Sequence, residues 1–411
     1  MADMAGHMPS PAKIFFDYLQ FFAVESREVN VKYRKFGMPG WETSVLGMGV
    51  MQKPIINEDM SKENITEYAT LIRYAIDHGI NFLDIGYPYD FGNFEYQNQQ
   101  VSLALKDGYR QRVKIAISLP SVLIDSAEDF DRLFNGQLKT LQINKVDFCL
   151  LGGLNRYSWP KVKQLDALQW AERAMSDGRI DRLGFSFHDD FQCLRNITQS
   201  YDKWAFCQVQ YSFMDCKHHP GTVGIEFAAD MGLPVVATEP LRWGRLTKNI
   251  PETVKRIWAS SPKYSPAEWG LRWVWNNPSV ITVVSDMDRI QQVDENIAIA
   301  ENAKPDCLSV EELVMFENIK NTYREMRNIR CTACRCCMNI PCPVGIDVPR
   351  IIEIYHDSIM YDNVKTAQYL YKIEKHSIDD CVKCCSCERT CPRRYPLLDV
   401  LSASKQLLDI N

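Results

Sequence analysis

This chain of 411 residues lacks long apolar runs and long basic runs. No apolar run approaches the roughly 20 residues that a membrane-spanning helix requires, so we expect no membrane segment. The first residues lack the basic start of a secretory signal, and Asp17 and Gln20 interrupt their apolar part. The net charge is -5 without long basic runs, which argues against a nucleic-acid groove. These absences predict a cytoplasmic protein.

Cysteine, in contrast, is concentrated near the C-terminus, where ten of the 15 cysteines follow residue 330. In a reducing compartment such clustering indicates metal ligation rather than disulfides. Two segments, CTACRCCMNIPCP from Cys331 and CVKCCSCERTCP from Cys381, form an internal repeat. The second segment has the spacing C-x2-C-x2-C-x3-C-P of bacterial two-cluster ferredoxins.

With this spacing, three close cysteines hold one 4Fe-4S cluster and the distant fourth cysteine serves the other cluster. We therefore predict one cluster held by Cys331, Cys334, Cys337 and Cys391, and a second held by Cys342, Cys381, Cys384 and Cys387. Zinc is the alternative, but a tetrahedral zinc site needs only two C-x2-C pairs and leaves the third cysteine and the proline of each copy unexplained. The extra thiols Cys336 and Cys385 are expected to be buried as small hydrophobic groups.

Upstream of the cysteines, eight short β-rich runs are each followed by a helical stretch. Eight such units predict an α/β fold, a (β/α)8 TIM barrel, followed by a C-terminal all-α, ferredoxin-like two-cluster iron-sulfur domain. The expected domains are an N-terminal extension (1–30), the barrel (31–305) and the cluster domain (306–411), with one or two helices between the cysteine segments. The strand candidates are TSVLGMGV, NFLDIG, VKIAIS, VDFCLLGG, IDRLGFSF, FCQVQYS, PVVATEP and SVITVVSD.

The chain resembles the aldo/keto reductases, in the subgroup with a C-terminal ferredoxin-like 4Fe-4S module. The resemblance begins at about Val31 and rests on NFLDIGYPY, GFSFHDD, CQVQYS, EPLRWGRL and DENIAIA. It implies hydride transfer from NADPH or NADH to a carbonyl, with a tetrad of Asp, Tyr, Lys and His at the strand ends. Asp84 and Tyr89 match the aspartate and the catalytic acid of the tetrad, whereas Ser118 stands in place of the lysine and Gly152 in place of the histidine.

Both replacements weaken the implied chemistry. A tyrosine with a pKa near ~10 is a poor acid at neutral pH unless a cation favours its ionised form, and Ser118 supplies none. Positioned acid-base groups contribute ~10²- to 10⁴-fold, so the loss of the imidazole at Gly152 is costly as well. We expect ordinary carbonyl reduction to be badly impaired.

The resemblance also marks where a nicotinamide cofactor would bind. Gln208 is the candidate for the nicotinamide carboxamide, and Arg242 and Arg245 are candidates for its phosphates, although both arginines are as well explained as solvated surface charges. Trp243 and Asp286 oppose a dinucleotide, since a bulky ring and an acid stand where small residues are usual. Binding of NAD(P)H is therefore doubtful.

Several other polar residues stand at the predicted barrel mouth, and most of them are expected to be structural. A metal site in MDCKHHP is a weak alternative, because its spacing is not specific. The residues at the mouth are Tyr87, Asn155, His188, Asp189, Gln210, Tyr211 and Glu239, and those in MDCKHHP are Cys216, His218 and His219.

The leading hypothesis is an anaerobic iron-sulfur oxidoreductase of aldo/keto reductase type. Single electrons from a carrier such as ferredoxin or flavodoxin would pass through the two clusters to a small-molecule substrate at the barrel mouth. One alternative is an NAD(P)H-dependent carbonyl reductase whose substitutions are compensated by neighbours. Another is a non-catalytic electron-transfer subunit, or a redox-neutral enzyme that uses Tyr89 and Asp84. The N-terminal segment IFFDYLQFF is expected to be a packing arm or a homodimer contact.

Overall fold

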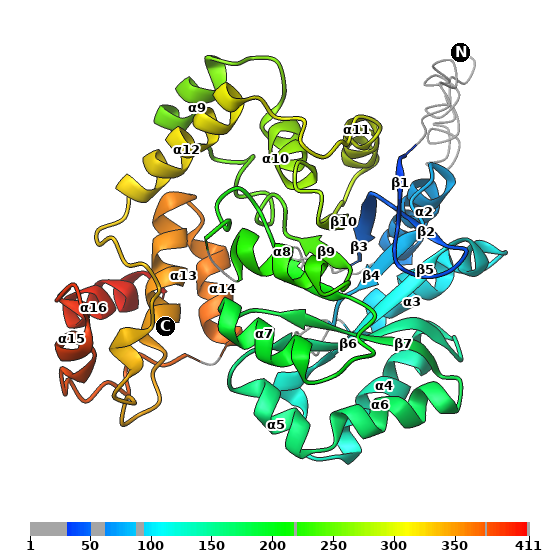
Figure 1. Ribbon diagram of the computed structural model, residues 1–411, viewed down its shortest axis with the longest axis horizontal. Coiled ribbons are helices and arrows are strands. Elements are labelled where there is room, and N and C mark those ends of the chain that lie inside the picture. Colours follow the sequence, from blue (N-terminus) through cyan, green and yellow to red (C-terminus); the bar gives the residue numbers. More distant parts are fainter. Residues whose placement is uncertain (1–30, 51–61, 88–93, 218–219, 375, 409–411) are drawn as a thin grey trace, which may run out of the picture.

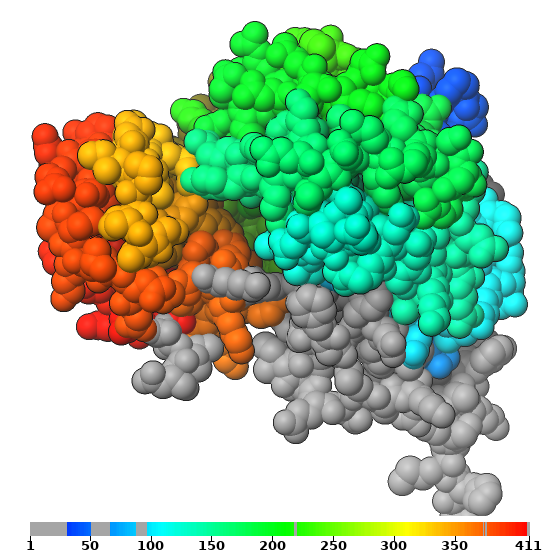
Figure 2. All heavy atoms as spheres, turned by 90° about the horizontal axis from the view of Figure 1, so that it is seen from below, coloured from blue at the N-terminus to red at the C-terminus, as the bar shows by residue number. Residues whose placement is uncertain are grey.

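A computed structural model of the protein describes residues 31–50, 62–87, 94–217, 220–374 and 376–408. The candidates Tyr89, His218 and His219 and the segment IFFDYLQFF lie outside these residues. The molecule consists of a barrel and a helical C-terminal part, which forms one end of the molecule in Figure 1 and, in orange and red, in Figure 2. Among the described residues, no helix is both long enough and apolar enough to span a membrane.

Eight parallel strands close into a barrel in the order β10-β3-β4-β5-β6-β7-β8-β9, which confirms all eight predicted strands. Nearly every residue of the longest strand, VDFCLLGGL, is buried, as expected for a parallel strand covered on both faces. The strands are β3 (Leu46–Gly49), β4 (Phe82–Ile85), β5 (Lys114–Pro120), β6 (Val146–Leu154), β7 (Ile180–Phe187), β8 (Cys207–Gln210), β9 (Val235–Thr238) and β10 (Val280–Asp286).

The helices that connect the strands form the outer layer of the barrel (Figure 1). Some of their starts are encoded locally: the Ser265 hydroxyl accepts the backbone N–H of Glu268 at the N-terminus of α10, which begins with Pro266. The described helices of this layer are α2 (Lys62–Asp77), α3 (Phe94–Ala104), α4 (Glu128–Leu141), α5 (Ser158–Gln164), α6 (Ala167–Ser176), α7 (Phe191–Gln199), α8 (Gly221–Asp230), α9 (Glu252–Ala259), α10 (Pro266–Trp275) and α11 (Ile290–Ala300), with the short 3-10 turns η1 (Tyr109–Arg112) and η2 (Ser121–Leu123).

The amino-terminal end of the barrel is closed by an antiparallel hairpin of β1 (Tyr33–Lys35) and β2 (Glu42–Ser44). Phe36 of this hairpin packs with Phe82, Phe148 and Phe206 from three barrel strands. The rings of Phe148 and Phe206 are 5.2 Å apart and nearly perpendicular, an arrangement that aromatic pairs favour. This plug leaves the opposite end, where the strands finish, as the end available for a site.

Beyond the barrel, α12 (Val310–Glu325) leads to the cysteine segments. It begins with a capping box in which the Ser309 hydroxyl accepts the N–H of Glu312 and the Glu312 carboxylate accepts the N–H of Ser309. The 3-10 turn η3 (Cys336–Met338) and the helices α13 (Val348–Met360), α14 (Val364–Ile373), α15 (Ser386–Thr390) and α16 (Leu397–Leu408) follow, so two helices lie between the cysteine segments, as predicted. Residues such as Ile351 and Leu401 give this part an apolar core of its own.

Candidate functional site

The carboxyl end of the barrel carries Asp84 on β4 and Gln208 on β8. The side-chain amide of Gln208 donates a hydrogen bond of 2.5 Å from Nε2 to Oδ2 of Asp84. Burial raises the pKa of the Asp84 carboxyl to about 6, although the hydrogen bond from Gln208 lowers it in part. Arg156, a conceivable alternative partner, binds Asp189 and Asp190 instead. Asp84 can therefore keep its proton near neutral pH.

The two replaced tetrad positions lie against each other on adjacent strands. Pro120 of β5 is opposite Gly152 of β6 in the register. A Cβ atom at position 152 would lie 2.2 Å from the Oγ atom of Ser118 and 3.0 Å from the carbonyl oxygen of Leu119. The serine hydroxyl thus occupies the space that a side chain at position 152 would need.

A similar approach occurs between β3 and β10. Asp286 is paired with Gly49 in the register, and a Cβ atom at position 49 would lie 2.0 Å from Oδ1 of Asp286. The absence of a side chain at Gly49 accommodates this carboxylate at the carboxyl end of the two strands. Asp286 therefore lies at the carboxyl end of β10, at the edge of the barrel where the sequence predicts an acid.

The loop after β9 has a strained backbone. Glu239, Arg242 and Trp243 all have positive φ angles (53°, 49° and 58°), which side-chain-bearing residues rarely adopt. Each such residue costs on the order of 1–3 kcal/mol and persists only when its surroundings enforce it. Burial also raises the pKa of the Glu239 carboxyl.

A buried ion-pair network enforces this loop. Arg242 donates from Nη2 to Oδ1 of Asp215 at 2.8 Å, and from Nη1 to Asp357 of α13 at 3.2 Å and to Tyr361, which directly follows α13, at 3.1 Å. Arg245 donates from Nη1 to Oδ2 of Asp357 at 2.8 Å. Both arginines are buried, so neither is a solvated surface charge. The network joins the loops after β8 and β9 to the helical C-terminal part.

Other polar residues at the mouth have structural contacts. Asp189 accepts hydrogen bonds from the backbone and the guanidinium of Arg156. Asn155 accepts the N–H groups of Tyr157 and Ser158 at the start of α5, and the Tyr211 hydroxyl is 2.9 Å from that of Thr222. These contacts fit the structural roles that the sequence predicts for this group.

The first set of four predicted ligands is brought together from both cysteine segments. Burial, together with the nearby sulfurs of Cys331, Cys334, Cys387 and Cys391, raises the pKa of the Cys337 thiol to about 12. The Cys331 thiol likewise interacts with Cys334 and Cys391. Cys391 therefore lies with the first segment rather than only with its own.

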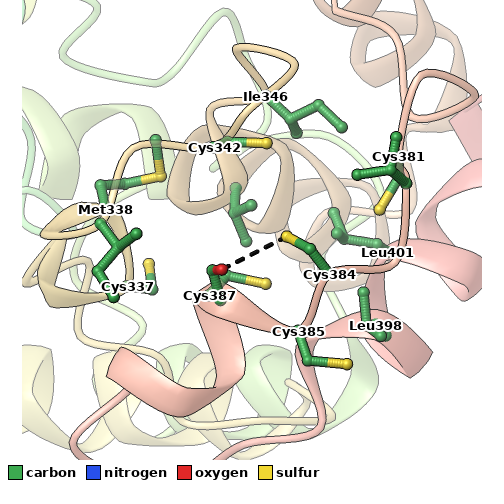
Figure 3. A pocket seen from close by; sticks show the side chains of 14 residues that line it. Cys337, Met338, Cys342, Ile346, Cys381, Cys384, Cys385, Cys387, Leu398 and Leu401 are labelled. Atoms are coloured by element: carbon green, nitrogen blue, oxygen red, sulfur yellow. Dashed lines mark hydrogen bonds between the residues drawn. The ribbon is translucent and has the colours of Figure 1, made fainter.

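The second set lines one pocket, shown in Figure 3, to which Cys337 of the first set and Cys385 also contribute. Cys342 comes from the first segment, whereas Cys381, Cys384 and Cys387 come from the second. Apolar residues such as Ile346 and Leu401 complete the pocket wall. The thiol of Cys385 points away from Cys342 in Figure 3, and it is half-buried, as is Cys336.

The two segments repeat the same backbone conformation around their second cysteine. Ala333 and Arg335 flank Cys334 with φ angles of 51° and 58°, and at the matching places Lys383 and Cys385 flank Cys384 with 52° and 56°. Alternating left-handed residues direct successive N–H groups into one concavity, a nest that is typical of phosphate and iron-sulfur sites.

Hydrogen bonds in these concavities lower the pKa of the Cys334 and Cys384 thiols. A hydrogen bond from the backbone N–H of Cys336 lowers the pKa of the Cys334 thiol. The Ser386 hydroxyl, 3.5 Å from the Cys384 sulfur, and the Ser386 N–H lower the pKa of the Cys384 thiol. Corresponding positions of the two repeats thus favour the thiolate, the form that binds metals.

The first cysteine segment faces the barrel. Arg335 donates to the hydroxyl of Tyr157, which lies in the loop between β6 and α5, at 3.3 Å, and to Asp347 at 2.6 Å. Cys331 and Ala333 line a pocket together with Asp215 and Arg242 from the loops after β8 and β9. Three loops at the carboxyl end of the barrel therefore contact the C-terminal part.

Within the described ranges, no three His, Cys, Asp or Glu side chains are gathered closely enough to hold one metal ion. Of the weak metal candidates in MDCKHHP, only Cys216 is described. Its sulfur accepts a hydrogen bond of 3.2 Å from the buried Lys320 ammonium.

A closed barrel of eight parallel strands, with polar side chains at its carboxyl end, places the protein among the TIM barrels. Residues 45–312, more than half of the chain, match the model of the aldo/keto reductase family, and the protein belongs to this family. No curated protein sequence matches the chain significantly.

Three solved structures illustrate the likeness. A thermostable aldo-keto reductase, Tm1743, in complex with the inhibitor epalrestat is 22% identical, with a TM-score of 0.57 over 70% of this chain and 99% of that chain. An aldo-keto reductase from Klebsiella pneumoniae in complex with NADPH is 21% identical, with a TM-score of 0.54 over 68% and 92%. The aldo-keto reductase AKR11C1 from Bacillus halodurans, in its holo form, is 23% identical, with a TM-score of 0.54 over 71% and 96%. At these identities the likeness shows the fold.

Two residues of the site were not anticipated from the sequence. Asp215 and Asp357 neutralise the arginines that were expected to meet phosphates. A signal existed for Asp357, because it occupies a buried position of α13 among apolar residues such as Ile354. An acid at such a position needs a buried cationic partner.

Proposed function

We propose that this aldo/keto reductase family member is an oxidoreductase that passes single electrons from two 4Fe-4S clusters to a small molecule at the carboxyl end of the barrel. The observation that supports the proposal is that cysteines of the two segments lie together: Cys391 lies near Cys331 and Cys337, and Cys342 lines one pocket with Cys381, Cys384 and Cys387. The set that contains Cys331 borders the pocket between the C-terminal part and the barrel loops.

The chain offers what such clusters need. A 4Fe-4S cluster takes four cysteine thiolates, one for each iron, so its ligands are spread over a larger volume than those of a single ion. Backbone nests at Cys334 and Cys384 would direct N–H groups toward the cluster sulfurs. Apolar neighbours such as Ile346 and Leu401 would exclude water on one side. When bound, the clusters would accept and release electrons one at a time.

The barrel would contribute protons and binding. Reduction of a double bond consumes two electrons and two protons, and Asp84 and Tyr89 are the two candidate donors. Because the pKa of Asp84 is about 6, about a tenth of its carboxyl groups carry a proton at pH 7, and Gln208 holds the orientation of the carboxyl. Neither Ser118 nor Gly152 can replace the cation and imidazole that hydride chemistry uses in this family.

A second candidate, NAD(P)H-dependent carbonyl reduction, is favoured by the family itself and by Gln208, which lies on β8 next to Asp84. The Klebsiella pneumoniae protein was solved with NADPH. In this chain, however, Arg242 and Arg245 already form ion pairs with Asp215 and Asp357, and Asp286 adds negative charge near the place for a pyrophosphate. The phosphates of a dinucleotide would have to compete with Asp215 and Asp357 for these two arginines.

The test is anaerobic purification followed by metal analysis, electron paramagnetic resonance and titration with NADPH. We expect about eight irons per chain, two sets of four, and signals that appear on reduction with dithionite. NADPH should bind weakly and leave the signals unchanged. Stoichiometric zinc without iron would contradict the cluster assignment, and prompt hydride transfer from NADPH to a carbonyl would favour the second candidate.

The role of the barrel is tested separately with Tyr89→Phe. If Tyr89 supplies a proton during turnover, this variant should lose activity while iron content and dithionite reduction stay at the wild-type level. Unchanged turnover would instead favour an electron-transfer subunit whose barrel is not catalytic.

A further inference from the structure

The second cysteine set, Cys342, Cys381, Cys384 and Cys387, lies beside exposed apolar residues. Val382 is 61% exposed and Ile340 is 49% exposed, although both are large hydrophobic residues. They line the same pocket as Cys381 and Cys384, and Cys384 is itself exposed. The set that faces the barrel also has one exposed cysteine, Cys334, but its Cys337 is buried. No cysteine of the second set is buried to that degree.

The segment that contributes Val382 and Cys384 to this surface is rich in exposed basic side chains. Lys383, Arg389, Arg393 and Arg394 are all exposed, and Glu388 is the one acidic residue between Cys381 and Tyr395. The Glu388 carboxylate accepts the backbone N–H of Leu398 near the start of α16, where the helix dipole stabilises it.

Two of the basic residues are connected to the pocket by hydrogen bonds. Arg389 donates to the hydroxyl of Ser386, which lines the pocket, and Arg394 donates to the carbonyl oxygen of Arg389. Of the two aspartates just before Cys381, Asp379 is paired with Lys405 and Asp380 is exposed, so four basic residues stand against Asp380 and Glu388. An excess of positive charge on this surface contrasts with the net charge of -5 of the whole chain.

Figure 1 shows α15 and α16 at the end of the molecule away from the barrel, with α13 and α14 between them and the barrel. A protein docked on the outer surface would therefore not obstruct the barrel mouth. An apolar centre with a rim of one charge sign is the usual arrangement of a transient interface, in which the charges steer the partner and raise its association rate.

We propose that the surface formed by Ile340, Val382 and Cys384 with Lys383, Arg389, Arg393 and Arg394 docks a small acidic one-electron carrier protein of the ferredoxin or flavodoxin class. The proposal rests on the proposed function. The carrier would lose one electron. The cluster that Cys342, Cys381, Cys384 and Cys387 would hold would gain it, and no bond or proton would be exchanged. A carrier of this chemistry complements the surface, since its acidic residues face the basic rim.

Binding is the direct test, with the anaerobically purified full chain and an oxidised acidic ferredoxin as the probe in calorimetry. Because steering is screened, affinity should fall as ionic strength rises from about 0.01 M to about 0.15 M, where the Debye length shortens from about 30 Å to about 8 Å. The double variant Lys383→Glu with Arg393→Glu should lose roughly tenfold or more in affinity and in the electron-transfer rate from the reduced probe. The matched control, Lys139→Glu with Lys248→Glu, reverses two exposed charges on the barrel and should bind like the wild type.

Iron content and reduction by dithionite separate this proposal from the proposed function. A protein without iron would overturn the proposed function. A protein with reducible clusters that binds the probe equally well in both double variants, or independently of salt, would overturn only the docking proposal. Binding to anionic lipid vesicles in place of the ferredoxin would also overturn it, because the basic surface would then serve a membrane.

Discussion

The hydroxyl oxygen of Ser118 lies 2.2 Å from the point at which a Cβ atom of residue 152 would stand. The two residues that replace the lysine and the histidine of the tetrad therefore share one volume, and neither position can be changed independently of the other. The substitutions at 118 and 152 act as a pair.

This contact predicts a measurable coupling. Gly152→Ala should reduce the free energy of unfolding by about 1–3 kcal/mol, because the new methyl group meets the Ser118 hydroxyl and the strand backbone. Ser118→Ala should recover part of that loss in the double variant, which a double-mutant cycle in denaturant would detect. Gly136→Ala is the control, since nothing lies within 4 Å of its Cβ position, and it should not destabilise the protein. Strictly additive effects of the two changes would show that the residues do not compete for space.

Asp84 predicts a pH dependence of stability. Its pKa is raised to about 6 in the folded protein, above the ordinary value of 3.8, so the folded state holds a proton that the unfolded state has released. The stability from this group is fully present below about pH 4, is lost as pH rises toward 6, and is constant above that. Between about pH 5 and about pH 7, the wild type should lose about 1 kcal/mol more than Asp84→Asn in anaerobic urea unfolding. Parallel pH profiles for the two proteins would contradict the raised pKa.

Asp357 should be critical for the attachment of the C-terminal part. Asp357→Asn removes the carboxylate that pairs with both buried arginines and leaves Arg242 its ion pair with Asp215, and breaking a buried pair costs roughly 3–5 kcal/mol. Asp362→Asn removes an exposed carboxylate close by and serves as the control. We expect a large shift of the unfolding midpoint for the first variant and little for the second. Equal midpoints would mean that the network is not important for stability.

The cysteine sets predict which centre each thiol serves. Cys391→Ala should remove about four irons and the signal of the centre held by Cys331, Cys334 and Cys337, although Cys391 belongs to the other segment. Cys385→Ala should keep about eight irons, because its thiol points away from Cys342. Loss of the second centre in Cys391→Ala would show instead that each segment holds its own cluster.

Much of the fold could be predicted because its determinants are local. Each barrel strand is a short apolar run, and the cysteine spacing already indicated that Cys391 lies with Cys331. Contacts between elements that are far apart in the sequence could not be predicted. The register that brings Ser118 against Gly152 depends on how β5 and β6 align, and nothing in the two short sequences specifies this alignment. The pairing of Arg242 with Asp357 joins residues on two different elements, and a buried arginine cannot be told from an exposed one by its neighbours in sequence.

The link between Arg242 and Asp357 also has a consequence for biosynthesis. The two residues are separated by 115 positions. At a synthesis rate of about 5–20 residues per second, the ribosome needs roughly 6 to 23 s to add helix α13 after the loop that follows β9 has been made. During this interval Asp357 is missing from the network, and the acids near the two arginines are Asp215 and Glu239. The ion pairs that join this loop to the C-terminal part can therefore form only after all eight barrel strands have been synthesised.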